Sequence, residues 1–507
     1  MQQLSEQDAA FLASDTAHAN ANVSLLHIYD QSTAPSGKVR FKTILKHIES
    51  RLGASPVFRR KLMPMPMGLD RPYWTDDEHF DLEYHVRHIA LPKPGDWRQF
   101  CIQVSRIHAR PLDLNRPLWE IYVIEGLDSF LDLPEGSFAL LTKTHHAALD
   151  LQHDGELITL LHDLSPDVGA APPPAPWFPA SPPSVLPLLA RGVLRNLTAP
   201  RRLIGPLSRR LMKLAPSRLA LARDRLLAAG DMPLVRFNAV VSPHRVFETR
   251  RFGIDEFKRI RSLVPGASVH DAVLAVCGGA LHRYLDHHCE LPAASLMALA
   301  PLSVRDGADA STQGLSWLRV ALGTELDDPL ERLRAVHAQT AGSEAMGRAV
   351  GAREQAEAAS TGAAAMFSRA ARLVTRMLAG ERSPLAACSI TNVPGPDTPL
   401  YLCGARMSYF SAMLPISDGM GLAFAVTSHD GRIIISPTSC RELMPDPERF
   451  AQCLRDSFQE LLALVPAEAP ANAAKPKAAA PRRARAAAPK PVAPVAATRR
   501  SRARPAA

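Results

Sequence analysis

A stretch near the middle of the chain, residues 166–240, constrains the fold most, because its composition does not suit a compact core. Proline is frequent at first, and residues Val185–Gly230 are then basic and apolar, with prolines that limit them to short amphipathic helices. On both sides the sequence alternates between strand-like and helix-like patterns. A chain of 507 residues also exceeds what one core usually serves. We therefore expect two α/β domains, residues 1–165 and 241–465, joined by this connection.

Four patterns predict secondary structure in the second domain. Val269–Tyr284 is apolar on most sides and predicts a buried helix, and Leu296–Val304 predicts a strand. Leu422–Ser436 alternates around Asp430-Gly431, which is a strong hairpin signal. Pro445–Leu464 has the periodicity of a closing amphipathic helix.

The net charge of +9 comes entirely from the end of the chain. Residues 466–507 carry ten Lys and Arg against the single acid Glu468, so the rest of the chain is neutral. The body therefore has no excess positive charge with which to cover nucleic acid, and no specific nucleic-acid partner is expected. The tail is rich in Ala, Pro, Lys and Arg, lacks aromatic residues and is predicted to be disordered. A solvated tail, or one that binds anionic lipid, a storage granule or nucleic acid without sequence preference, stays open.

The cysteines and the hydropathy pattern bear on the compartment. The seven cysteines are scattered singly without a CxxC pair, which favours a reducing compartment. No basic segment followed by an apolar one opens the chain, and no run of about 18 apolar residues occurs, so neither a signal peptide nor a transmembrane helix is expected. The basic stretch Val185–Gly230 either docks on an anionic membrane or lipid-body surface, at about 1 kcal/mol for each basic residue, or is a solvated crossover.

The strongest candidate for chemistry is a pair of adjacent histidines, His145 and His146. Ser137–Thr144 predicts a strand that leads into the pair, and a helix with Asp154 as its N-cap is predicted after the turn. Successive side chains at the end of a strand point to opposite faces, so one ring can face a reaction channel while the other packs in the core. A neutral histidine can take a proton from a hydroxyl and return it to a leaving group.

Local chemistry leaves other interpretations of this segment open. Both rings can be ordinary, partly buried histidines, and Asp150 can fix the turn or hold a ring. A metal set that includes His153 is disfavoured, because no standard zinc spacing is present. Two short matches elsewhere are also set aside: Asp286–Cys289 spells DHHC without a cysteine-rich zinc domain, and Gly266–His270 lacks the second glycine of a nucleophile elbow.

Several motifs together resemble one family. His145-His146-Ala-Ala-Leu-Asp150 resembles the HHxxxDG signature of the acyl-CoA-dependent acyltransferase superfamily, which includes chloramphenicol acetyltransferases and peptide-synthetase condensation domains. The order of the other blocks is similar to that of the bacterial wax ester synthase/diacylglycerol acyltransferase family. These blocks are LSEQDAAFL at Leu4–Leu12, RPLWE at Arg116–Glu120, PLSVR at Pro301–Arg305 and TNVPGP at Thr391–Pro396.

The resemblance implies a fold and a mechanism. The fold would be two similar chloramphenicol-acetyltransferase-like domains with a reaction channel between them. His146 would be the general base, His145 a supporting residue, and Asp150 a structural residue that orients the turn, with Arg305 as its candidate partner. Acyl-CoA would be the co-substrate and diacylglycerol or a long-chain alcohol the acceptor, with no metal and no resident cofactor. The enzyme would be cytoplasmic and peripherally associated with the inner membrane or lipid inclusions; its CoA contacts and oligomeric state stay open.

Three positions depart from the family pattern. Leu151 stands where the family has glycine, His270 precedes Asp271 where it has asparagine, and Leu315 follows Gly314 where it has asparagine. A glycine after the aspartate would allow a backbone conformation that leucine adopts only at a cost. The alternative function is therefore a catalytically weak surface protein of lipid bodies or granules that keeps the same fold.

Overall fold

The computed structural model describes most of the chain up to residue 466. The described ranges are 2–65, 70–129, 133–134, 136–148, 160–167, 177–180, 233–303, 315–349, 386–395 and 398–466. Residues Met1–Val465 form one compact unit. Most of the connection 166–240 and almost all of the predicted tail 466–507 lie outside the described residues, so the boundaries proposed for them stay predictions.

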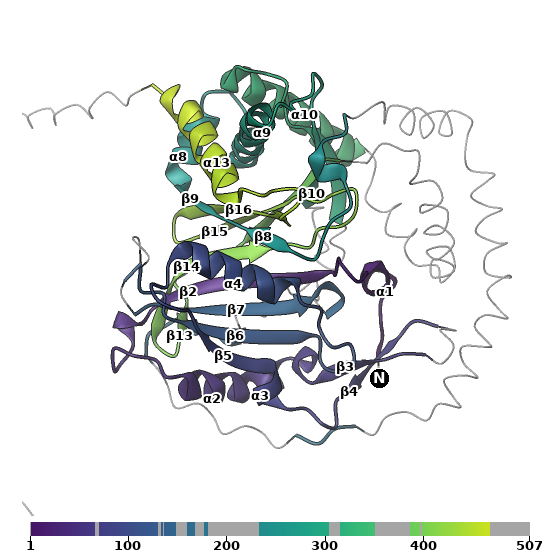
Figure 1. The fold of residues 1–507 in the computed structure, drawn as a ribbon, viewed down its shortest axis with the longest axis vertical. Helices are drawn as coiled ribbons and strands as arrows, with labels where there is room; N and C mark the ends of the chain where they lie inside the picture. Colours follow the sequence, from purple (N-terminus) through teal and green to yellow (C-terminus); the bar gives the residue numbers. More distant parts are fainter. Residues whose placement is uncertain are drawn as a thin grey trace, which may run out of the picture. The chain divides into compact units, whose positions relative to one another are not determined.

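The first large sheet has six strands and receives helices on both faces (Figure 1). Its strands, in spatial order, are β13 (Tyr401–Leu402), β14 (Ala405–Met413), β2 (Asn22–Asp30), β7 (Phe138–His145), β6 (Trp119–Glu125) and β5 (Val86–Ala90). Alternate side chains of β7 serve opposite faces. Leu140 packs in the cluster that contains Ile44 and Ile48 of α2 (Phe41–Arg51), whereas Leu141 packs with Phe100 of α4 (Trp97–Ala109). A short helix, α3 (Leu82–His85), precedes β5.

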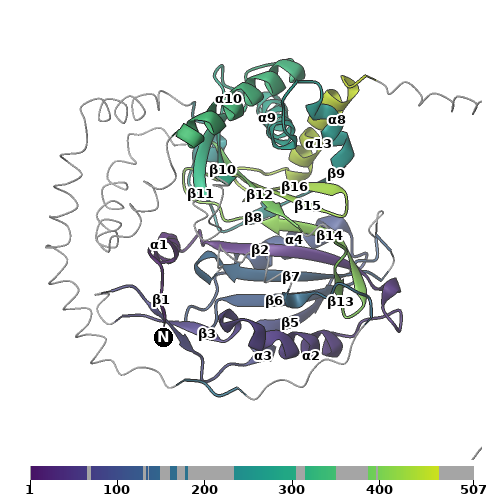
Figure 2. The ribbon, with the colours of Figure 1, turned by 180° about the vertical axis from the view of Figure 1, so that it is seen from behind.

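The second large sheet is formed by the later part of the chain. Its strands are β11 (Leu315–Ala321), β10 (Met297–Ser303), β12 (Cys388–Pro394), β15 (Ala423–His429), β16 (Arg432–Cys440) and β8 (Arg245–Phe247), with β9 (Arg250–Gly253) also pairing with β16. Figure 2 shows its helices gathered on one side: α8 (Ile254–Arg261), α9 (Val269–His287), α10 (Pro329–Ala349) and α13 (Pro447–Ala463). A small third sheet of β1 (Gln2–Gln3), β4 (Tyr73–Asp76) and β3 (Arg60–Met63) accompanies α1 (Glu6–Ser14).

The second half of the chain contributes two strands to the first sheet. β13 and β14 come from residues 401–413, yet β14 pairs with β2 in the first sheet, from Arg406 opposite Asp30 to Met413 opposite Ser24. The two domains expected from the sequence, residues 1–165 and 241–465, do not predict that strands of the second join the sheet of the first. The chain leaves the second sheet after β12 and returns to it at β15. In between, β14 ties the two halves together through main-chain hydrogen bonds to the first sheet.

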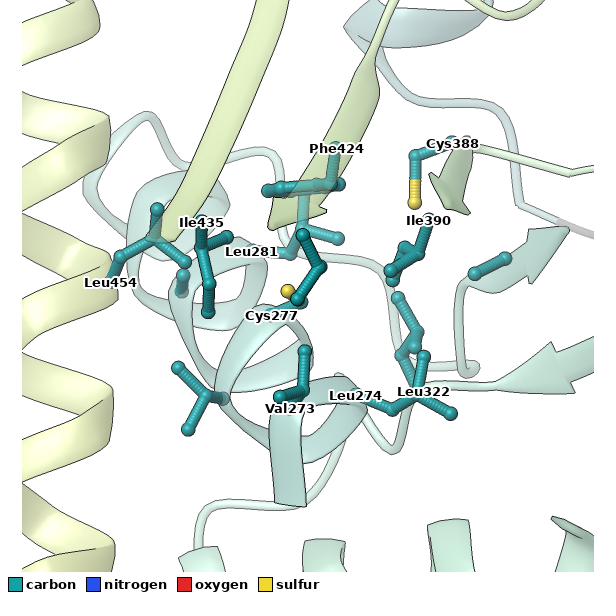
Figure 3. Packing of buried hydrophobic residues seen from close by; sticks show 14 of the residues in the cluster. Val273, Leu274, Cys277, Leu281, Leu322, Cys388, Ile390, Phe424, Ile435 and Leu454 are labelled. Carbon is teal, nitrogen blue, oxygen red and sulfur yellow. The ribbon is translucent and has the colours of Figure 1, made fainter. Parts of the chain in front are cut away.

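Helix α9 is the centre of the second core. Val273, Leu274, Cys277 and Leu281 are all at most 2% exposed, and Figure 3 shows them among side chains from β15, β16 and α13. A helix that is apolar on nearly all sides must be surrounded on nearly all sides. The structure thus confirms the buried helix predicted for Val269–Tyr284.

The other predictions for the second domain are also confirmed. The turn between β15 and β16 has φ of 47° at Asp430 and 72° at Gly431, the positive values that a two-residue hairpin of this type requires. Strand β10 and helix α13 occupy the predicted segments, and α13 has Pro447 in its first turn. Ser268 accepts a hydrogen bond from Asp271 N–H as the N-cap of α9, so it is a capping residue and no nucleophile elbow forms there.

Two further findings concern the cysteines and the membrane. All seven cysteines are free, and six of them are buried. Among the described helices, none combines the length and the apolar character that crossing a bilayer demands.

Candidate active site

The two histidines lie where β7 ends and a 3₁₀ turn, His146–Ala148, begins. His145 is opposite Asn22 of β2, and its N–H donates to Leu118 O (3.0 Å). His146 N–H donates to Ala21 O (2.8 Å). The predicted strand leading into the pair is confirmed, and main-chain bonds on both sides hold the pair between the start of β2 and the segment that contains the PLW motif.

His145 is buried, with 1% of its surface exposed, and is held in one tautomer. The N–H of Ala147 donates to its Nδ1 (3.1 Å), so the ring proton is on Nε2, which donates to Oδ2 of Asp15 (3.1 Å). The other carboxylate oxygen of Asp15 accepts the N–H of Ala21 (2.8 Å). Asp15 therefore joins the segment before β2 to the end of β7, and Ala21 in turn accepts the N–H of His146.

His146 has a different environment. Its ring is partly exposed and stacks on Phe11 of α1, with the ring centroids 3.7 Å apart and the planes inclined by 19°. Burial, assisted by the neighbouring His145, lowers the pKa of His146 to about 4. The buried Nδ1 has no hydrogen-bond partner on another described residue. The imidazole is thus neutral at pH 7, and a neutral imidazole can accept a proton.

The remaining predicted site residues lie outside the described residues. These are Asp150, Leu151, Arg305 and the predicted helix N-cap Asp154. The orienting role of Asp150 and its pairing with Arg305 stay predictions. Among the described residues no group of three or more His, Cys, Asp or Glu side chains is placed to hold a metal ion; His153 is not among them.

The sequence reasoning missed three residues near the pair. Asp15 and Phe11 lie about 130 residues before it, and the one signal for them is that they fall in or just after the opening LSEQDAAFL block. Lys143 precedes His145 by two residues on the same face of β7 and is completely buried, with Nζ 3.6 Å from Oε2 of Glu120 in the PLWE motif. Burial lowers the pKa of Lys143 to about 8 even though Glu120 opposes the shift.

Comparison with known proteins decides the family. A model of the wax ester synthase/diacylglycerol acyltransferase catalytic domain matches residues 4–273, and a model of the WS/DGAT C-terminal domain matches residues 314–462. The chain belongs to the wax ester synthase/diacylglycerol acyltransferase family. Within this WS/DGAT family, the putative diacyglycerol O-acyltransferase MT1809 of Mycobacterium tuberculosis is 31% identical over 466 residues, covering 91% of this chain and 90% of the relative. The probable diacyglycerol O-acyltransferase tgs2 of M. tuberculosis is 31% identical over 409 residues, covering 80% and 87%.

Solved structures agree on the WS/DGAT fold. The wax ester synthase/diacylglycerol acyltransferase from Marinobacter aquaeolei VT8 superposes with a TM-score of 0.65 at 23% identity, covering 91% of this chain and 98% of that one. The first condensation domain of the calcium-dependent antibiotic synthetase superposes with a TM-score of 0.53 at 14% identity, covering 92% and 96%. The expected chloramphenicol-acetyltransferase-like α/β fold is confirmed, and this WS/DGAT chain is an acyltransferase.

Proposed function

We propose that this acyltransferase moves a fatty acyl group from acyl-CoA to diacylglycerol and so makes triacylglycerol, with long-chain alcohols as further acceptors. The relatives named as diacylglycerol O-acyltransferases support the acceptor. The observation that carries the chemistry is the neutral, partly exposed imidazole of His146 beside an Asp15-anchored His145.

His146 acts as general base and then as general acid. It takes the proton of the acceptor hydroxyl, the oxygen attacks the thioester carbonyl, the carbon–sulfur bond breaks, and the imidazolium returns its proton to the CoA sulfur. In this proposed route the acceptor oxygen attacks the thioester directly, so no acyl-enzyme forms and no metal takes part. His145 supports this step through the turn, since its bonds to Asp15 and Ala147 hold the backbone that carries His146.

The site also has to receive lipid. Both candidate acceptors are membrane lipids, so we place the enzyme at the surface of the inner membrane or of lipid inclusions, where such substrates reside. Asp150 completes the proposed site as an orienting residue for the turn after His146.

The test is acyl transfer by purified full-length protein from radiolabelled acyl-CoA to diacylglycerol and a panel of alcohols. His146→Ala is expected to lower kcat/KM by about 10²–10⁴-fold, because it removes proton transfer while leaving the fold in place. His337→Ala is the matched control: its imidazole also bonds to an aspartate, but at α10, and its variant should keep wild-type turnover when folded. Wild-type protein that forms no product with any acceptor would favour the alternative role as a lipid-body or granule surface protein.

A further inference from the structure

A cavity of about 370 Å³ lies between α4 of the first half and β8 of the second, next to the start of α13. Both ribbon views place α4 and β8 side by side (Figures 1 and 2). The cavity is lined by Arg98, Cys101, Ile102, Ser105 and Arg106 of α4 and by Arg110, the C-cap residue of that helix. Residues of β8 and α13 and Arg441, which follows β16, complete it, so both halves of the chain build this cavity.

Positive charge dominates the lining. Five arginines line the cavity against two carboxylates, those of Glu248 and Glu448, although the body of the chain is neutral. Arg98 pairs with Glu448 (3.3 Å), and Glu248 accepts from Trp97 and lies 3.4 Å from Arg250. Both carboxylates are therefore engaged by groups other than the remaining four arginines.

Those four arginines form no ion pair with a carboxylate among the residues that the structure describes. Arg106, Arg110 and Arg441 have no carboxylate within ion-pair distance among the residues that the structure describes, and all three are exposed. Arg245 is 8% exposed, and its guanidinium donates to main-chain oxygens of Ser242 and His18, which are neutral. A concave surface with several unpaired guanidinium groups favours a ligand with more than one negative charge.

The cavity adjoins the segment that holds His146. The side chains of Asn20 and Asn22 donate to the main-chain oxygens of Ala109 and Arg110, at 3.0 and 3.1 Å. Ala21, between these asparagines, accepts the N–H of His146. One strand end therefore separates the end of the arginine-lined cavity from the proposed base.

We infer that this cavity binds the phosphates at the nucleotide end of acyl-CoA, with Arg106 and Arg110 as their principal contacts. The inference rests on the proposed function, in which acyl-CoA is the donor. Guanidinium groups suit phosphate because they donate two parallel hydrogen bonds, whereas diacylglycerol and alcohols carry no charge to match this lining. Ile102, which is 38% exposed on α4, offers an apolar surface to the adenine ring. The flexible pantetheine arm would then lead past Asn20 and Asn22 toward His146.

The first experiment varies the substrate together with the protein. In the Arg106→Gln/Arg110→Gln double variant, the KM for acyl-CoA should rise about tenfold to a hundredfold, while kcat and the KM for diacylglycerol stay near wild type. With S-acyl pantetheine, which has no nucleotide and no 3′-phosphate, wild type and variant should have the same KM. Arg261→Gln, an exposed arginine on α8 outside the cavity, is the charge-matched control and should match wild type with both donors. An equal loss with both donors would overturn the inference, because the arginines would then act elsewhere than on the phosphates.

The second experiment needs no turnover, so it separates this inference from the proposed function. Adenosine 3′,5′-bisphosphate should bind wild type in titration calorimetry and bind the double variant at least about tenfold more weakly. Sedimentation with phosphatidylglycerol vesicles, run on the same proteins, should show no difference between them. If the variant loses vesicle binding and keeps its affinity for the bisphosphate, the cavity serves a lipid headgroup and the inference is wrong. If the bisphosphate binds as expected but wild type transfers no acyl group, the proposed function fails and the nucleotide site stands.

Discussion

Two aspartate–histidine pairs lie in different parts of the molecule and have hydrogen bonds of nearly the same length, one at Nε2 and one at Nδ1 of the histidine. At the end of β7, His145 bonds to Asp15 at 3.1 Å. At the start of α9, His337 of α10 bonds to Asp271 at 3.0 Å. An aspartate that holds a histidine is often taken as a sign of catalysis. The surroundings of the two pairs show which of them lies beside a candidate reactive group.

In the second pair the aspartate has a structural role at the start of α9. Asp271 also accepts hydrogen bonds from Ser268 N–H (2.9 Å) and the Thr340 hydroxyl (2.8 Å), and closes the capping box of α9. Burial alone would raise the pKa of Asp271, but these hydrogen bonds more than offset it and lower the pKa. The other ring nitrogen of His337 faces Gly266.

The first pair differs because of its neighbour. Both ring nitrogens of His145 are hydrogen-bonded, whereas the next residue, His146, has a partly exposed ring whose pKa burial lowers to about 4. In both pairs the aspartate–histidine bond thus holds two segments of the chain together. In the proposed mechanism the reactive group at the first site is His146, and the bond between Asp15 and His145 holds the turn that carries it.

Among the changes that test this comparison, the largest effect is expected from removing the bond between Asp15 and His145. Asp15→Ala removes the acceptor for His145 Nε2–H and for Ala21 N–H, so the turn that carries His146 loses two of its supports. We expect kcat to fall about 10–100-fold, the usual range when a supporting partner of a reactive group is lost. Steady-state assays at saturating acyl-CoA and diacylglycerol would measure it.

Asp15→Asn supplies the control for this change. The amide oxygen can still accept one of the two hydrogen bonds, so this variant should recover much of the activity. Equal activity of Asp15→Ala and wild type, with both proteins folded by circular dichroism, would show that the bond to His145 has no part in positioning His146.

Removing the carboxylate of the second pair should lower the stability of the protein and leave its activity unchanged. Asp271→Ala leaves the Ser268 N–H and the His337 ring without their acceptor and leaves the Thr340 hydroxyl with only the main-chain oxygen of His337. We expect a loss of about 1–3 kcal/mol in the free energy of unfolding, with kcat unchanged at temperatures where the variant is folded. Urea denaturation and the transfer assay measure the two quantities. A kcat that falls as far as in Asp15→Ala would remove the distinction between the pairs.

Local sequence patterns predicted the helices and strands that are determined by residues close to one another in the sequence. The Asp430-Gly431 hairpin follows from the backbone conformations of two residues, and the burial of α9 follows from its own apolar composition. The strand ending at the histidine pair was also predicted, because its apolar run and the turn after it are adjacent. The crossover of β14 was not predicted, since which sheet a strand joins depends on partners hundreds of residues away.

The candidate site divides in the same way. His145 and His146 were found because they are adjacent and carry the motif. Asp15 was missed, although it bonds to His145, because 130 residues separate them and an isolated aspartate in a helix-ending segment has many possible roles. The lowered pKa of His146 likewise depends on burial by distant residues such as Phe11, which no local pattern reports.

The smallest effect concerns the acidity of His146 itself. Protonated His146 cannot accept the hydroxyl proton, so kcat/KM should fall as the pH falls through its pKa of about 4, below the ordinary value for histidine. Phe11→Ala would admit water to the stacked face and stabilise the imidazolium. That change raises the pKa and moves the acid limb of the pH–rate profile upward by about one unit, equivalent to ~1.4 kcal/mol. Phe41→Ala removes a phenylalanine stacked on His88 at 4.8 Å, away from the pair, and should leave the profile unchanged. A wild-type acid limb near pH 6.5 would mean that a solvated group, and not the partly buried imidazole of His146, carries the proton.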